Sequence, residues 1–160
     1  MTQRISVTQR IQLSPGIPKA FKALIAMSDE VTRAGADAGV DPALLELVKI
    51  RGSQLNGCAY CLDMHTADAI KHGEDPRRIF LLDAWRETEL FTEQERAALE
   101  LTEVMTRLSQ TQNVPDEVYQ QATKVFTEAQ YQAVAWMIVL INTFNRLGVP
   151  SRARLPRRAG

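Results

Sequence analysis

Apolar residues recur along most of the chain every three or four positions, which is the spacing of helices that bury one face. Short β-prone runs such as 48–50 lie inside these helical patterns, so we expect no strand. The pattern predicts one all-α domain of about seven helices with short connections. The predicted helices span residues 17–36, 42–55, 58–72, 76–86, 93–109, 115–125 and 128–147.

Capping residues support these boundaries. Side chains that can accept hydrogen bonds from the first turn of a helix precede four of the segments: Asp41, Asp75, Thr92 and Thr127. Prolines follow both aspartates at the first helical position, and Glu95 completes a capping box with Thr92. Gly73 and Gly148 follow helical runs, where a left-handed residue commonly ends a helix.

The last predicted helix is apolar around most of its circumference, most clearly at residues 133–141. A helix of this kind is buried on several sides, either inside its own domain or between subunits. We therefore expect a homo-oligomer. The apolar run is far shorter than the roughly 20 residues that a membrane-spanning helix needs, so we expect no membrane association.

Composition and charge narrow the class of protein. The 160 residues are 45% apolar and 24% charged, which is the balance of an ordinary globular domain. Nineteen Lys and Arg offset nineteen Asp and Glu, so the chain has no general attraction for nucleic acid or for an anionic membrane. Residues 1–16 lack the long apolar run of a secretory signal, and we expect a cytoplasmic protein.

The two ends of the domain are expected to form an N-terminal arm, residues 1–13, and an arginine-rich tail, residues 150–160. The last ten residues contain four arginines. Because chain ends are commonly solvated and frayed, we favour that interpretation of the tail. The alternative is an arm that contacts a partner or another subunit.

Both cysteines of the chain lie in a Cys-x-x-Cys motif that follows a predicted turn. The Asn-Gly pair at 56–57 favours a turn, so helices 42–55 and 58–72 should form a hairpin. Cys58 then lies at the start of the second helix and Cys61 in its first turn. Unpaired N–H groups and the helix dipole favour a thiolate at this position. In a reducing compartment, such a pair suggests redox chemistry or metal binding.

A histidine and a glutamate are expected beside these thiols. His65 lies four residues after Cys61 on the same helix face, where its imidazole can accept the thiol proton. In an antiparallel hairpin, Glu46 falls within ~3 Å of His65 along the helix axis. There the carboxylate can orient the ring and raise its basicity, which predicts a Glu–His–Cys relay.

The residues by themselves leave the attacking thiol open. Proximity to the dipole and exposure favour Cys58, whereas the register of the histidine favours Cys61. Three further residues are weaker candidates for lining the site, since two share a side of the first helix with the glutamate and one lies between the cysteines: Lys49, Ser53 and Tyr60.

Zinc binding is the main competing interpretation of the cysteines and histidines. Along one helix, Cys58 and His72 are about 21 Å apart, whereas zinc–ligand bonds are about 2.0–2.3 Å long. We therefore expect no metal site within the chain, with zinc completed by another subunit as a minor alternative. His72 precedes Gly73 and is expected to cap the helix. Four large apolar residues are expected in the core rather than in a pocket: Met64, Phe80, Trp85 and Trp136.

At these residues the chain resembles the AhpD-like alkylhydroperoxidase family, within the carboxymuconolactone decarboxylase superfamily. The family pattern is Glu, eleven residues, Cys-x-x-Cys, three residues, His. Every spacing is present here in Glu46, Cys58, Cys61 and His65. The flanking segments SPGIPKAFKALIAM and VPDEVYQQATKVF are also similar to family helices, so the resemblance covers most of residues 14–149.

The resemblance implies an all-helical fold that assembles as trimers or hexamers, and a thiol peroxidase that needs no cofactor. It implies that Cys61 is the peroxidatic thiol, that Cys58 is its disulfide partner, and that Glu46 and His65 form the proton relay. The implied partners are a hydroperoxide substrate and an external dithiol reductant, such as a lipoyl or thioredoxin-like protein. Some members carry a histidine where this chain has Tyr60, which leaves the efficiency of peroxide reduction open.

Three alternative functions remain. The protein can be a dithiol–disulfide oxidoreductase, or an electron carrier to a partner, without efficient peroxidase activity. It can be a metal-bound or interaction scaffold. It can also be a lactone decarboxylase, although the superfamily's decarboxylases lack this cysteine pair.

Overall fold

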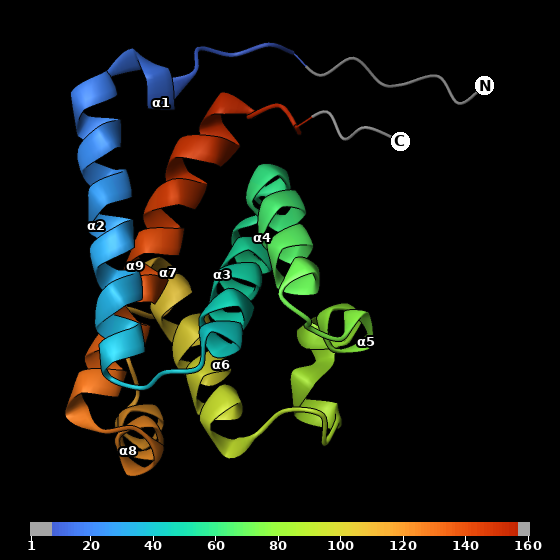
Figure 1. Cartoon of the computed structure of the whole chain (residues 1–160), viewed down its shortest axis with the longest axis vertical. Coiled ribbons are helices and arrows are strands. Elements are labelled where there is room, and N and C mark those ends of the chain that lie inside the picture. The colour runs from blue at the N-terminus through green and yellow to red at the C-terminus, as the bar shows by residue number, and fades with distance from the viewer. Residues whose placement is uncertain (1–7, 157–160) are drawn as a thin grey trace.

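The computed structural model describes residues 8–156, and all regular structure within them is helical (Figure 1). The prediction of an all-α fold is confirmed, but the helical elements number ten rather than about seven. They are α1 (Leu13–Gly16), α2 (Pro18–Asp37), α3 (Pro42–Asn56), α4 (Ala59–Lys71), α5 (Pro76–Phe80), the 3₁₀-helix η1 (Leu82–Glu87), α6 (Glu93–Thr106), α7 (Leu108–Thr111), α8 (Asp116–Val125) and α9 (Glu128–Ser151).

The extra elements are short helices that the sequence pattern merged or missed. The segment predicted at 76–86 is divided into α5 and η1, with Ala84 in a non-helical conformation. Leu82 and Trp85 are both buried there, because residues three apart lie on one face of a 3₁₀-helix. The segment predicted at 93–109 likewise ends at Thr106 and resumes as α7.

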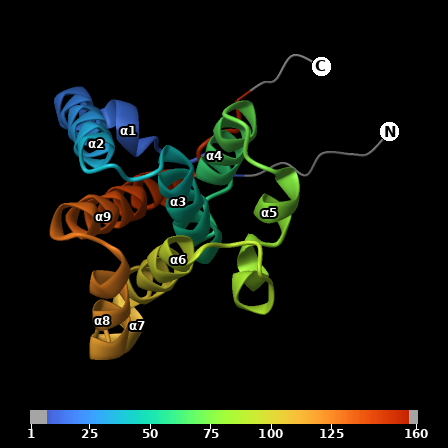
Figure 2. The ribbon, with the colours of Figure 1, turned by 60° about the horizontal axis from the view of Figure 1, so that its bottom comes forward.

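Helix α3 occupies the centre of the fold and packs against α4, α6 and α9 (Figure 2). Leu47, Val48 and Ile50 of α3 are almost fully buried between these neighbours. On α9, Met137 and Ile141 face the same core. The helix that carries the predicted glutamate is therefore surrounded on several sides, which holds its side chains in defined positions.

The predicted hairpin is present and consists of α3 and α4, the two helices on either side of Gly57. Asp41 caps α3 by accepting a hydrogen bond from the Ala43 N–H at 2.9 Å. Gly57 alone makes the turn, with a φ of +67°, and α4 begins directly after Cys58. The capping boxes at the starts of α6 and α9 are also formed.

Gly148 does not end a helix, contrary to the sequence prediction. Helix α9 continues through Gly148 and Pro150, and Arg152 adopts the left-handed conformation with a φ of +46°. A Cβ at Gly148 would lie 3.0 Å from Cys58 Sγ. This glycine therefore permits close helix packing instead of a turn, whereas Gly73 does adopt the predicted positive φ of +96°.

The burial predicted for two aromatic side chains is wrong. Trp136 is 52% exposed and Phe80 is 82% exposed, whereas Trp85 is buried as expected. Trp136 lies on the outer face of α9, next to inward-facing Met137. An apolar outer face is consistent with subunit contacts, but the trimer or hexamer stays a prediction.

Helix α9 is also the one helix among residues 8–156 that is long and apolar enough to cross a membrane by length and composition. The 24-residue helix exceeds the short apolar run on which the sequence argument relied. Its inward side chains, such as Val134, Ile138 and Leu140, belong to the hydrophobic core of the domain.

The described parts of the two ends lie against each other. Gln12 Nε2 donates to the Ser151 carbonyl at 2.8 Å, and Arg154 Nη2 donates to Gln9 Oε1 at 2.8 Å. Arg154 is therefore hydrogen-bonded to the start of the chain, while Arg152 and Arg154 are both exposed. The solvated tail stays a prediction. The predictions for the arm at 1–7 and for the tail at 157–160 lie outside the described residues.

Candidate functional site

The two cysteines lie at the start of α4 with their sulfur atoms side by side. Cys58 is the N-cap residue, and Cys61 is in the first turn. Both are free thiols, with 2.8 Å between the Sγ atoms. They are 1% and 3% exposed, respectively. Little movement is needed to join them in a disulfide, because i,i+3 residues of a helix share a face.

Glu46 and His65 face each other across the hairpin. Glu46 Oε2 lies 3.2 Å from His65 Nδ1, and Lys49 Nζ lies 2.5 Å from Glu46 Oε1. The 3.2 Å contact is at ion-pair distance without the alignment of a hydrogen bond, and neither atom has a hydrogen-bond partner among the described residues. At this distance the carboxylate is placed to orient the imidazole.

The carboxylate of this pair is kept ionised. Burial by itself would raise the pKa of Glu46, but the contacts with His65 and Lys49 outweigh it and hold the pKa below its ordinary value. An anionic Glu46 beside Nδ1 favours the tautomer in which Nδ1 carries the proton. The opposite ring nitrogen is then free to act as a base.

The thiols are held by a polar group that the sequence analysis missed. Asn145 of α9 is 1% exposed, accepts a hydrogen bond from Asn56 Nδ2 at 2.9 Å and donates to Ser53 Oγ at 3.1 Å. Its amide also contacts both sulfur atoms. The available signal was an amide in the second half of a largely apolar helix, but Asn142 of the same helix gives the same signal, and the sequence places neither beside the cysteines.

The cysteine pair loses its first proton readily and its second with difficulty. The hydrogen bond from Cys61 is the main cause that lowers the pKa of Cys58 to about 6; burial opposes it, and N–H donors and Asn145 assist. The same bond and burial raise the pKa of Cys61. In this arrangement the Cys61 thiol donates a hydrogen bond to a Cys58 thiolate, so the pair carries one negative charge, mainly on Cys58. The position of Cys58 at the helix start also favours the thiolate there.

Alkylation should show this low pKa directly. We expect the rate of Cys58 modification by iodoacetamide to rise with pH around a midpoint near 6, rather than near the free-cysteine value of about 8.5. Asn145→Leu should move the midpoint upward, because the thiolate loses a donor. Gln132→Leu is the matched control, since this exposed amide of α9 donates to Glu128 Oε1 at 3.1 Å, away from the thiols. An unshifted wild-type midpoint would contradict the assignment.

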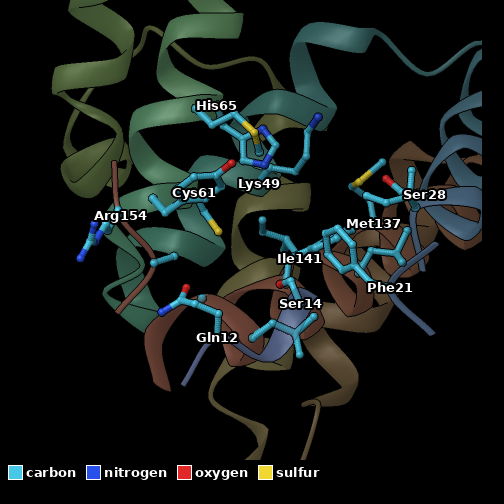
Figure 3. A pocket seen from close by; sticks show the side chains of 18 of the residues that line it. Gln12, Ser14, Phe21, Ser28, Lys49, Cys61, His65, Met137, Ile141 and Arg154 are labelled. Atoms are coloured by element: carbon cyan, nitrogen blue, oxygen red, sulfur yellow. The ribbon is translucent and has the colours of Figure 1, made fainter. Parts of the chain in front are cut away.

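A cavity of about 730 Å³ opens beside Cys61 and His65 (Figure 3). We call it the apolar cavity, because most of its wall is made of large apolar side chains from α2, α4 and α9: Phe21, Ile25, Met64, Met137, Leu140, Ile141, Phe144 and Leu147. Lys49 and Tyr60 add polar groups near the thiol. The cavity can therefore admit a bulky apolar molecule to the Cys61 side of the pair.

The other predicted residues take different positions. Ser53 is fully buried and does not line the cavity, but its hydroxyl contacts the Cys61 thiol and accepts a hydrogen bond from Asn145 Nδ2 at 3.1 Å. His72 lies at the far end of α4, where its Nδ1 contacts the Asp68 carbonyl at 2.8 Å. Within residues 8–156, no group of three or more His, Cys, Asp and Glu side chains is arranged to hold a metal ion.

Comparison with known proteins supports the family resemblance in both sequence and fold. The model of the carboxymuconolactone decarboxylase family matches residues 18–104. An uncharacterized protein of Bacillus subtilis (strain 168), YdfG, is 38% identical over 143 residues, which cover 89% of this chain and 94% of the relative.

Solved structures share the fold. A protein of unknown function from Agrobacterium tumefaciens, ATU0492, described as a candidate antioxidant defence protein AhpD, superposes with a TM-score of 0.85. It is 32% identical, with 94% of this chain and 100% of that chain covered. An uncharacterized peroxidase-related protein from Silicibacter sp. TM1040 shows the fold alone, with a TM-score of 0.69, 19% identity and coverage of 85% and 70%. The chain therefore belongs to the carboxymuconolactone decarboxylase family and has the fold of its AhpD-like members.

Proposed function

We propose that the protein is a thiol-dependent hydroperoxide reductase that uses Cys58 and Cys61 as a redox pair. The observation that carries the proposal is the placement of an adjacent dithiol and a Glu46–His65 pair at one end of an apolar cavity. An activated thiol needs a nucleophile, a base and a group that orients the base, and these residues supply all three. The proposed setting is a cytoplasmic homo-oligomer.

The proposed reaction begins with removal of the Cys61 proton by His65, which Glu46 orients. The thiolate attacks the terminal oxygen of the hydroperoxide and the O–O bond breaks, which gives a Cys61 sulfenic acid and an alkoxide. Protonated His65 returns its proton to the alkoxide, which leaves as an alcohol. Cys58 then attacks the sulfenic sulfur, which releases water and forms the disulfide. An external dithiol returns two electrons and two protons and regenerates both thiols.

Mass spectrometry combined with turnover tests this function. After one equivalent of cumene hydroperoxide, the protein should lose the mass of two hydrogens, and catalysis should continue with dihydrolipoamide as reductant. A variant with both cysteines changed to serine is the control and should do neither. Persistence of the reduced mass in the parent protein would exclude the proposed function.

The second candidate is a dithiol–disulfide oxidoreductase that passes electrons to a partner. Tyr60 favours it, because this residue occupies the position where some family members have a histidine. Turnover of a low-molecular-weight disulfide with dihydrolipoamide, measured beside cumene hydroperoxide turnover, distinguishes the two. A lactone decarboxylase, by contrast, would keep its activity when both cysteines are serine.

Glu46→Gln should lower the rate of peroxide reduction by about 10²-fold, the lower end of the range for general acid–base groups. The amide has the same shape but no charge, so the imidazole loses the anion that orients it. The measurement is kcat/KM for cumene hydroperoxide across pH. Protonation of Glu46, whose pKa is held below its ordinary value, should lower the rate in acid in the parent protein, and this acidic limb should be absent in the variant. Glu30→Gln, which removes an exposed carboxylate paired with Arg33, should leave the rate unchanged. Equal rates for Glu46→Gln and the parent protein would remove Glu46 from the relay.

A further inference from the structure

The two sulfur atoms of the pair border different cavities. Cys61 lines the apolar cavity, whereas Cys58 lines a second cavity of about 810 Å³. The residues that border both cavities form the partition between them: Gln9, Gln12, Tyr60, Gly148, Ala153 and Arg154. The cysteine pair therefore lies between the two cavities, and one cysteine borders each of them.

The second cavity carries uncompensated positive charge, and we call it the basic cavity. Arg10, Arg152 and Arg154 line it, all three are exposed, and no Asp or Glu side chain is part of its wall. None of the three forms an ion pair with a carboxylate of residues 8–156, although Arg10 and Arg154 donate to a carbonyl and an amide oxygen. A cavity of this charge favours an anionic ligand.

The wall beside Cys58 consists of small residues. Gly57 and Ala59 flank the cysteine in the chain, and Gly148 faces it from α9. A Cβ at Gly148 would lie only 3.0 Å from Cys58 Sγ, so the backbone of α9 packs directly against the sulfur, which is 1% exposed. These neighbours carry no bulky side chain, so a thiol in the basic cavity reaches Cys58 when the backbone around Gly57 and Gly148 moves apart.

We propose that the basic cavity binds the reductant, that this reductant is an anionic dithiol, and that it attacks Cys58 while the hydroperoxide reacts at Cys61 from the apolar cavity. The inference rests on the proposed function and adds the site, the charge and the point of attack of the second substrate. Separate entrances allow oxidant and reductant to react with one disulfide without competing for space.

The reductive step balances as thiol–disulfide exchange. One thiolate of the reductant attacks Cys58 Sγ, the bond between the two cysteines breaks, and a mixed disulfide with Cys58 forms. Cys61 leaves as a thiolate on the side of His65, which can return the proton. The second thiol of the reductant then attacks its own sulfur in the mixed disulfide. This step forms the intramolecular disulfide of the oxidised reductant and releases Cys58 as a thiol.

The reductive half-reaction tests the charge of the site without any peroxide. The disulfide is formed with diamide and then reduced with dihydrolipoate, which is anionic, or with neutral dihydrolipoamide. We expect dihydrolipoate to be about 5- to 10-fold faster at low ionic strength, and the difference to vanish at high salt as charges are screened. Equal rates in low salt, or a faster neutral dithiol, would overturn the proposal.

Matched arginine variants locate the site. Arg152→Gln and Arg10→Gln together should remove the preference for dihydrolipoate while leaving reduction by dihydrolipoamide and oxidation by cumene hydroperoxide unchanged. Arg33→Gln, an exposed arginine of α2, is the control and should keep the preference. A preference that survives the double change would place the reductant elsewhere.

The point of attack can be read from a trapped intermediate. Oxidised protein is mixed with glutathione, quenched with acid, alkylated and cut with chymotrypsin after Tyr60, which separates the two cysteines. Glutathione should be found on Cys58 and the alkyl group on Cys61, and the reverse pattern would overturn the assignment. If the proposed peroxidase function fails, diamide still forms the disulfide, so the two failures are distinguishable.

Discussion

Replacing Cys61 with serine should abolish hydroperoxide turnover, with a loss of more than about 10³-fold, because a serine hydroxyl is a far weaker nucleophile than a thiolate. Cys58→Ser should behave differently. It should consume one equivalent of peroxide and stop, since the sulfenic acid formed at Cys61 then lacks a thiol partner. The two variants therefore separate the attacking sulfur from the resolving one.

Mass spectrometry measures this difference directly. After one equivalent of cumene hydroperoxide and trapping with dimedone, Cys58→Ser should carry the adduct at position 61, and Cys61→Ser should carry none. The lowered pKa of Cys58 provides the competing expectation, because a thiolate at the helix start is also a nucleophile. An adduct found only in Cys61→Ser would reverse the two roles while leaving the dithiol reaction intact.

The largest effect on stability is expected at Glu103. This carboxylate is 5% exposed, and it accepts hydrogen bonds from Trp85 Nε1 at 2.9 Å, Arg51 Nε at 3.0 Å and Arg86 Nη1 at 2.9 Å. Glu103→Ala leaves the buried Arg51 guanidinium without this partner, which costs about 3–5 kcal/mol for a buried pair. Urea unfolding followed by tryptophan fluorescence gives the change in free energy of unfolding.

The same carboxylate should make the free energy of unfolding fall in acid. Burial opposes ionisation of Glu103, but Trp85, Arg86 and Arg51 outweigh it and lower the pKa. Because the folded-state pKa is below the unfolded value of about 4.3, the stabilisation is complete above that value and is lost as pH falls through the folded-state pKa. In Glu103→Ala, the free energy of unfolding should therefore depend less on pH over this acidic range.

Glu100→Ala is the matched control, since this half-exposed glutamate of α6 contacts Arg86 at 3.4 Å. Its effect on unfolding should stay within about 0.5 kcal/mol, as for other surface substitutions. A Glu103→Ala effect of the same size would show that the buried network contributes little. The network matters for the site because Arg51 belongs to α3, the helix that also carries Glu46.

Most of the local structure followed from short stretches of sequence. The Asp-Pro caps, the two capping boxes and the left-handed Gly57 are decided by residues within a turn of each other. The contact of Glu46 with His65 also followed, because a hairpin with a fixed turn sets the register of its two helices. The merged helices at 76–86 and 93–109 show where periodicity alone is insufficient.

By itself, therefore, the sequence determined the all-α class, the hairpin and the juxtaposition of Glu46 and His65. The tertiary structure decided what reaches that hairpin from residues distant in the chain. Asn145 beside the thiols, Gly148 against Cys58, Trp136 on an outer face and Arg154 at the cavity rim all depend on how α9 and the chain ends pack. Helical periodicity states which residues share a face, but the burial and partner of that face are set by packing with other elements.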